Sequence, residues 1–259
     1  MRAFCPGLSV RGSNGPKEFQ GASECMRVVS PHFFYGFGGP AQELGPKDDC
    51  EEIAMVRIGI VGALGYTGHE LLRVLIGHPQ AKLTVVADLP RFAGTPVGEV
   101  FPSLRGRCDL VLSELAVGDL AGKIDVAILA LPHKEGMTVA PSLLEKGIKV
   151  VDLSADYRLK DRAIYEEYYK ETHTSPELLK SAVYGLPEIY REDIRRASLV
   201  ANPGCYPGSA ILPLYPLIKE RLIEVDSIVV DSKSGVSGAG RGTNPAFMFA
   251  EVNESMKAY

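Results

Sequence analysis

One stretch decides the fold of this chain: Arg57-Ile-Gly-Ile-Val-Gly-Ala-Leu-Gly-Tyr-Thr-Gly68. Its first half is a short apolar run, which is typical of a buried strand. Its second half is a glycine-rich turn that leads into a helical pattern with Leu71, Leu72 and Leu75 on one face. A strand, a glycine-rich turn and a helix at the start of a βαβ unit together predict a dinucleotide-binding domain.

The glycines of this turn indicate how the ligand is held. They let the backbone approach a pyrophosphate, and the helix N-terminus offers it partial positive charge. Because the spacing is GxxGxxG and not GxGxxG, we expect a dinucleotide, but the spacing does not fix its subclass. The predicted contacts are Gly62, Leu64, Gly65, Tyr66, Thr67 and Gly68.

The end of the next predicted strand, Leu83–Asp88, should report which dinucleotide binds. Asp88 lies where an acid would hold the ribose 2′-OH of NAD. Arg91 lies just beyond it, where an arginine would pair with the 2′-phosphate of NADP. Both residues also fit a solvated loop. These residues alone therefore leave NAD and NADP open.

Further along the chain, apolar strand patterns alternate with amphipathic helices. This alternation predicts an α/β fold, in which a Rossmann-type parallel sheet carries helices on both faces. We expect strands at 124–131 and 148–153, a minor strand at Val111–Leu112, a helix at about 134–146, and helical turns and loop without a strand at 156–196.

Two features fall at the carboxyl edge of this predicted sheet, where open α/β sheets bind ligands. Pro132 and His133 follow a central strand, and His133 fits a ligand contact and a surface loop equally well. The run Ala197–Ala201 predicts a short strand that stops at Asn202-Pro203, because the residue before a proline avoids helical geometry. A mostly helical run follows, so Cys205 would lie on a tight turn near a helix N-terminus. A thiolate is favoured there; the alternative is a small buried hydrophobe.

Composition excludes several classes of protein. The 259 residues carry a formal net charge of −4 and no basic cluster, so nothing indicates a nucleic-acid partner. The longest apolar run, near Val126 to Leu131, is far short of the ~20 residues that a membrane span needs. Five cysteines form no CxxC pair and five histidines are scattered, so we expect no metal site. We expect a cytoplasmic protein.

Residues 1–54 differ in character from the rest of the chain. They are rich in Gly and Pro, lack helical or strand periodicity, and end in an acidic run. They contain no apolar core of a signal peptide, and the acids argue against a transit peptide. We expect a disordered or non-native N-terminal extension, with the natural domain beginning at Met55. A partner-binding tail is the alternative.

Two patterns remain in the last quarter of the chain. Tyr215-Pro-Leu-Ile-Lys219 matches the YxxxK motif of short-chain dehydrogenases, but Pro216 disrupts the regular helix that this motif needs. The run Ser227–Lys233 predicts another strand, which leads into a second glycine-rich loop, Ser234–Arg241.

Six motifs in order carry a family resemblance: Gly62–Gly68, Ala130-Leu-Pro-His133, Val151-Asp-Leu-Ser-Ala-Asp-Tyr-Arg158, Val183-Tyr-Gly-Leu-Pro-Glu188, Asn202-Pro-Gly-Cys-Tyr-Pro207 and Ser234-Gly-Val-Ser-Gly-Ala-Gly-Arg241. With them, the stretch from about Met55 to Tyr259 resembles the N-acetyl-gamma-glutamyl-phosphate reductases, the arginine-pathway relatives of aspartate-semialdehyde dehydrogenase. The resemblance implies a dinucleotide-binding domain at 55–203. It also implies that an α+β catalytic and dimerisation domain begins at 204–259.

The resemblance also implies an activity. Cys205 would attack a small acyl phosphate and form a thioester, which NADPH would reduce to a semialdehyde. NADP as cofactor favours Arg91 over Asp88, and the family form is a homo-oligomer. The residues that match the family's pocket and nicotinamide loop are Ser154, Arg158, Asn202 and Gly238.

In this family a catalytic histidine follows the tyrosine that matches Tyr259. We therefore expect the sequence given to be incomplete at its C-terminus and inactive as it stands. Two alternatives remain open at this stage. One is the similar reductase that acts on an aminoadipate derivative in lysine synthesis, and the other is a non-catalytic dinucleotide-binding remnant.

Overall fold

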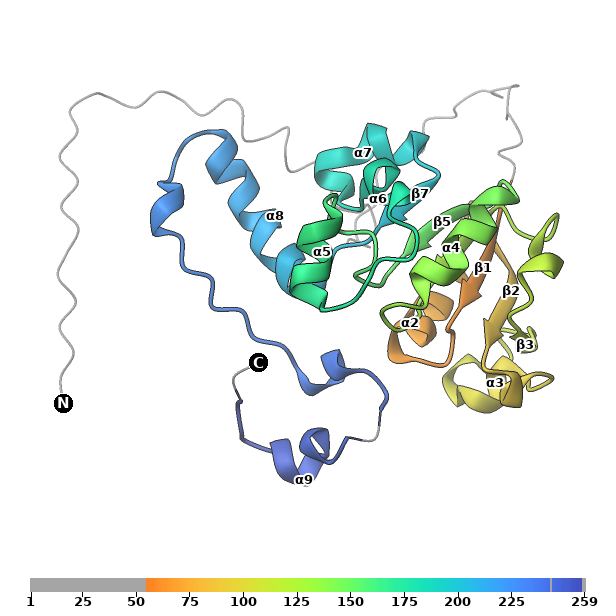
Figure 1. Ribbon diagram of the computed structural model, residues 1–259. Coiled ribbons are helices and arrows are strands. Elements are labelled where there is room, and N and C mark those ends of the chain that lie inside the picture. Colours follow the sequence, from red (N-terminus) through yellow and green to blue (C-terminus); the bar gives the residue numbers. More distant parts are fainter. Residues whose placement is uncertain (1–54, 243, 258–259) are drawn as a thin grey trace, which may run out of the picture. The chain divides into compact units, whose positions relative to one another are not determined.

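The computed structural model describes residues 55–242 and 244–257. The predicted N-terminal extension, residues 1–54, lies outside the described residues. Within the described ranges, a seven-stranded sheet has the order β3-β2-β1-β4-β5-β7-β6, and its strand pairs are parallel (Figure 1). The strands are β1 (Val56–Val61), β2 (Ala81–Asp88), β3 (Ser113–Glu114), β4 (Val126–Leu129), β5 (Lys149–Asp152), β6 (Val183–Tyr184) and β7 (Leu199–Ala201).

The strand order reverses between β1 and β4. From β1 the chain moves outward to β2 and β3, and from β4 it moves the other way to β5. Val61 at the end of β1 pairs with Leu129 at the end of β4, so the loops that follow these strands leave the sheet side by side. Ligands of open α/β sheets bind at such a reversal point. Helix α2 (Tyr66–Leu75) follows the first loop and α4 (Gly136–Glu145) follows the second.

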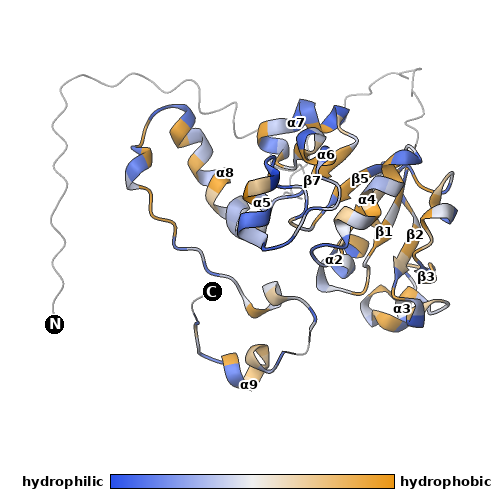
Figure 2. Ribbon diagram, viewed as in Figure 1, coloured by the Kyte–Doolittle hydropathy of each residue, from blue (hydrophilic) through white to orange (hydrophobic). Residues whose placement is uncertain are grey.

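Both faces of the sheet are covered, as the sequence predicts. Ile60 packs with residues of α2 and α3 (Val97–Val100), whereas its neighbour Val61 packs with residues of α4 and α5 (Arg162–Tyr169). Successive side chains of a strand point to opposite faces, so one apolar run supplies two cores. Figure 2 shows the resulting hydrophobic character along β1 and β5.

Short elements complete the region between β2 and β4. They are three 3-10 turns at Pro90–Phe92, Pro102–Leu104 and Val117–Leu120. The minor strand expected at Val111–Leu112 is wrong in position. Val111 makes only an isolated bridge to Pro96, and β3 begins two residues after Val111, at Ser113.

The region after β5 is mainly helical, as predicted, but it also contains a strand that the sequence analysis excluded. Its helices are α5, α6 (Glu177–Ser181) and α7 (Pro187–Arg196). Strand β6 is only two residues long and exists because Val183 and Tyr184 find partners in Val200 and Ala201 of β7. A pairing between segments so far apart in sequence leaves little local signal.

After β7 the chain forms α8 (Cys205–Lys219), three 3-10 turns and α9 (Phe249–Val252). The turns are Val225–Ser227, Val236–Ala239 and Pro245–Phe247. The strand expected at Ser227–Lys233 is wrong: no strand forms in that described segment, and Val229 is 90% exposed. A strand needs a hydrogen-bonded neighbour, and β-propensity alone does not supply one. Within the described ranges, every helix is too short or too polar to cross a lipid bilayer.

Candidate active site

Two glycines of the first loop are required by the fold itself. Gly62 has φ +85°, and a Cβ added there would lie 2.4 Å from the carbonyl oxygen of Ala130. A Cβ added at Gly68 would lie 2.4 Å from the carbonyl oxygen of Ala63. The first glycine therefore lets the loop after β1 approach the backbone that follows β4, and the last allows α2 to pack closely on the loop.

Gly65 is different, because no protein atom demands a glycine there. It is the N-cap residue of α2, and the nearest atom to an added Cβ would be the Gly62 oxygen at 4.0 Å. The open space lies at a helix N-terminus whose first residues, Tyr66 and Thr67, are exposed. A cradle that only a side chain at Gly65 would fill fits the pyrophosphate of a dinucleotide.

Asp88, at the end of β2, is engaged by the backbone around it. Its carboxylate accepts hydrogen bonds from the amide of Leu64 at 2.8 Å and the amide of Leu89 at 2.7 Å. It thereby ties the glycine-rich loop to β2. Arg91 follows in the 3-10 turn, exposed, with its guanidinium 4.9 Å from the ring centre of Phe92. Within the described ranges Arg91 forms no ion pair.

Pro132 and His133 are exposed in the turn after β4. The Nδ1 atom of His133 accepts a hydrogen bond from the amide of Ala155 at 3.0 Å, so the proton of the neutral ring sits on Nε2. The ring centre of Tyr169 lies 6.0 Å from that of His133. The next residue, Lys134, has φ +80°, a left-handed conformation that is uncommon for a residue with a Cβ.

The loop after β5 buries three polar side chains. The Ser154 hydroxyl donates to the carboxylate of Asp152 at 2.7 Å and accepts from the amide of Asp156 at 3.1 Å. Burial raises the pKa of Asp152 to about 6, although the two hydrogen bonds from Ser154 act in the opposite direction. The hydroxyl of Ser154 is thus turned into the protein, and its predicted place in a substrate pocket stays a prediction.

Arg158 joins the ends of β5 and β7. Its Nε donates to the carbonyl of Asn202 at 2.7 Å, and its Nη2 donates to the carbonyl of Leu153 at 2.8 Å. Its Nη1 lies against Gly204, where an added Cβ would be 3.0 Å away. Asn202 is fixed in turn, since its amide donates to the carbonyl of Asp152 at 2.8 Å and its Nδ2 donates to the carbonyl of Pro203 at 3.1 Å.

Cys205 is exposed and is the first residue of α8, one residue after the extended N-cap Gly204. This position confirms the predicted strand, turn and helix N-terminus. The guanidinium of Arg158 lies beside the same turn. The other free cysteine of the described residues, Cys108, is buried. Helix N-termini and nearby cations are surroundings that favour the thiolate form of a cysteine.

Gly238 lies in the exposed 3-10 turn Val236–Ala239. The glycine-rich loop around it reaches the first loop through Arg241, whose Nη1 donates to the carbonyl of Leu64 at 3.1 Å. The Arg241 guanidinium also lies 5.5 Å from the ring centre of Phe101. The structure thus brings the two glycine-rich loops into contact at a residue that the sequence analysis had not selected.

The reversal point of the sheet and the glycine cradle define a dinucleotide-binding fold, which carries an exposed cysteine at a helix N-terminus. The chain belongs to the semialdehyde dehydrogenase family. Residues 57–197 match the part described as "Semialdehyde dehydrogenase, NAD binding domain", and residues 205–259 match the "Semialdehyde dehydrogenase, dimerisation domain".

Two curated relatives carry the same name. The chain is 52% identical over 205 residues to the N-acetyl-gamma-glutamyl-phosphate reductase of Citrifermentans bemidjiense, and 55% identical over 205 residues to that of Pelobacter propionicus. Each match covers 79% of this chain and 59% of the relative. The chain therefore spans about three fifths of the length of these relatives.

A solved structure supports the fold. Aspartate semialdehyde dehydrogenase with NADP from Candida albicans superposes with a TM-score of 0.50 at 18% identity. The superposition covers 64% of this chain and 48% of that one. At this identity the likeness shows the fold alone.

Proposed function

We propose that this chain carries the cofactor site and the nucleophile of an NADPH-dependent reductase, which converts N-acetyl-gamma-glutamyl phosphate to the corresponding semialdehyde in arginine biosynthesis. The names of the curated relatives support this substrate over the aminoadipate derivative of lysine synthesis. One observation carries the proposal: Cys205, exposed at the first turn of α8, shares a turn with the guanidinium of Arg158.

The proposed role of Cys205 is covalent. Its thiolate attacks the acyl carbon, the bond between that carbon and the phosphate oxygen breaks, and phosphate leaves with the bonding electrons. A thioester on Sγ results. The amides at the start of α8 favour negative charge beside the thiol. Arg158 keeps Nη1 on the side of Gly204, where it can hold an anionic group of the substrate, because its other two nitrogens each donate to a carbonyl.

When bound, the cofactor would supply the hydride for reduction of the thioester to an aldehyde, with Cys205 leaving as the thiolate. The glycine loop, with Gly62, Gly65 and Gly68, would hold its pyrophosphate. Arg91 would take the 2′-phosphate, while Asp88 is already engaged by two backbone amides and so is less suited to a ribose hydroxyl. This arrangement supports NADP over NAD. Pro132, His133 and Gly238 would contact the nicotinamide end.

Two coarser properties belong to the same proposal. The match of residues 205–259 to a dimerisation domain supports a homo-oligomer. A cytoplasmic location follows from the metabolic role that the relatives' names suggest. The proposed partner is a small acyl phosphate.

The test is acylation of the protein, which needs no hydride transfer. The 259-residue chain is mixed with N-acetyl-gamma-glutamyl phosphate, and its intact mass and the released phosphate are measured. We expect one acyl group on the wild-type chain and on the control Cys108→Ser, and none on Cys205→Ser. Acylation of Cys205→Ser, or phosphate release without an adduct on any variant, would contradict the proposal and favour a non-catalytic domain.

A further inference from the structure

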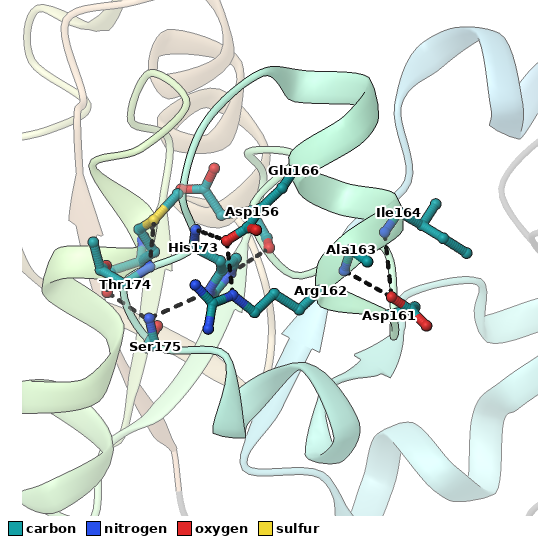
Figure 3. Close-up of polar contacts among 10 residues, drawn as sticks. Asp156, Asp161, Arg162, Ala163, Ile164, Glu166, His173, Thr174 and Ser175 are labelled. Atoms are coloured by element: carbon teal, nitrogen blue, oxygen red, sulfur yellow. Dashed lines mark hydrogen bonds and ion pairs between the residues drawn. The ribbon is translucent and has the colours of Figure 1, made fainter.

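Asp156 is a fully buried carboxylate for which the proposed chemistry has no use. Its oxygens accept hydrogen bonds from the amide of Lys134 at 3.0 Å, the amide of Met137 at 3.1 Å and the hydroxyl of Tyr165 at 3.1 Å. Its backbone carbonyl lies 2.8 Å from Nε2 of His173 (Figure 3). Such a set of donors fixes the position of the carboxylate in the core.

Two of these donors follow β4: Lys134 lies in the turn and Met137 in the first turn of α4. Met137 is the second residue of α4, whose own N-cap residue, Glu135, makes no side-chain capping bond. Asp156 therefore caps α4 from a different loop. Lys134 holds the left-handed φ of +80°, and its amide lies 3.0 Å from both oxygens of Asp156. An unfavourable backbone conformation persists only where the surrounding structure holds it. Here Asp156 holds the amide of Lys134, and Glu171 pairs with its Nζ at 2.6 Å.

The residue immediately before this strained position is His133. Its ring is held from the same loop, since Ala155, next to Asp156, donates its amide to Nδ1. The 152–158 loop thus forms hydrogen bonds with the ring of His133, the amide of Lys134 and, in α4, the amide of Met137. The exposed part of that turn, Pro132 and His133, follows the strand that pairs with β1 at the reversal point of the sheet.

We propose that Asp156 is a positioning residue, which fixes the Pro132–Lys134 turn as a rigid wall for the nicotinamide end of the cofactor. This inference rests on the proposed function. An asparagine at this site would keep one acceptor oxygen, but its NH2 would face another donor. The turn would then relax, without any change at the glycine loop or Arg91.

The test compares two ligands on the 259-residue chain. NADPH carries both ends of the cofactor, whereas adenosine 2′,5′-bisphosphate carries only the 2′-phosphate end. For Asp156→Asn we expect NADPH binding, followed by nicotinamide fluorescence, to weaken about tenfold, with the bisphosphate unchanged within about twofold. Equal weakening of both ligands by a folded Asp156→Asn chain would overturn the inference.

Another aspartate of the chain provides a matched control. Asp161 is an exposed carboxylate that caps α5 through the amides of Ala163 at 2.7 Å and Ile164 at 3.2 Å (Figure 3). Asp161→Asn should lower stability slightly and leave both ligands unchanged. A nicotinamide-specific loss in Asp161→Asn equal to that in Asp156→Asn would overturn the assignment.

A second variant guards against failure of Asp156→Asn to fold. Glycine adopts a φ of +80° without strain, so Lys134→Gly in the Asp156→Asn background should restore folding. The turn would still lack its anchor, and the weakening specific to NADPH should remain. Wild-type affinity for NADPH in this double variant would overturn the inference. Failure of the wild-type chain to bind NADPH would instead overturn the proposed function, and this inference with it.

Discussion

The described chain contains two regions that differ sharply in burial. Between Val56 and Ala201, side chains of both faces of a parallel sheet are buried, and every buried residue of the described ranges lies before Asn202. From Cys205 onward the chain also contains apolar side chains, but many of the large ones are exposed. Val229 is 90% exposed and Phe249 is 79% exposed. The difference teaches that apolar sequence buries itself only where the topology supplies a neighbour.

The largest expected effect is the difference in stability between substitutions at two glycines, one from each region. Gly68→Ala places a Cβ 2.4 Å from backbone atoms, so it should cost about 3 kcal/mol and lower the melting temperature by roughly 6–12 °C. Gly208→Ala, within α8, meets no atom within 4 Å and should stabilise the helix by up to ~1 kcal/mol. Thermal unfolding of both variants is the measurement. Similar shifts of one sign would break the comparison.

The two cysteines give the next effect. Cys205 is exposed, whereas Cys108 is 9% exposed within the core around α2 and α3. A buried thiol reacts only when the structure opens locally, so Cys205 should label about 100-fold faster with iodoacetamide at neutral pH. Peptide mapping over time measures the ratio, and the denatured chain provides the control. Equal rates in the native chain would show that the first region opens freely.

Acid should act on the first region through Asp152. Burial raises the pKa of Asp152 to about 6 in the folded chain, above the ordinary value near 3.8. The folded state therefore holds its proton to higher pH than the unfolded state, and this carboxyl lowers stability as pH rises from about 4 to 6. Asp152→Asn removes that dependence.

The stability difference between Asp152→Asn and wild type should thus grow in favour of the variant by about 2 kcal/mol across this pH range. Urea unfolding at several pH values measures it. Glu220→Gln, an exposed acid in the second region, is the control and should show no trend. A constant difference for Asp152→Asn would mean that its carboxyl is hydrated in the folded chain.

The smallest effect concerns cofactor recognition by an arginine from each region. Arg91→Ala should weaken NADPH about tenfold, or about 1.4 kcal/mol, and leave NADH within twofold, because only NADPH carries the 2′-phosphate. Arg241, which touches the first loop from the second region, should matter less, with both cofactors weakened about twofold when it becomes alanine. A larger loss in Arg241→Ala would show that the second region takes a main part in binding.

Most of the sheet could be predicted from the sequence because its signals are local. A few neighbouring residues are enough to predict the conformation of three features. These are the apolar run that ends at Gly62, the glycine-rich turn and the turn at Asn202-Pro203. The position of Cys205 at a helix start followed from the same kind of signal. Strand β6 and the absent strand at Ser227–Lys233 show the limit, since each depends on whether a distant segment lies alongside.

The candidate site was predicted in outline but not in its supporting contacts. Asp88 was weighed as a ribose ligand, yet its carboxylate holds the amide of Leu64. Asp156 was not selected, although the alternation of Asp152, Ser154 and Asp156 after a buried strand was a usable signal. Polar residues at alternate positions there suggest a loop whose own side chains form hydrogen bonds with its backbone. Their partners in the turn after β4 lie about twenty residues away in sequence, beyond what any local pattern reports.

The open space at Gly65 has a genetic consequence. Changes at Gly62 and Gly68 collide with backbone and should remove the protein from the cell, so such alleles would behave as simple losses. A Cβ at Gly65 would make no close contact with the rest of the protein. The Gly65→Ala protein should therefore accumulate at normal abundance but fail to bind the cofactor. In a homo-oligomer such a subunit would still assemble with intact copies. Three glycines within seven residues would then produce two kinds of inheritance, recessive at the outer positions and dominant-negative at the middle one.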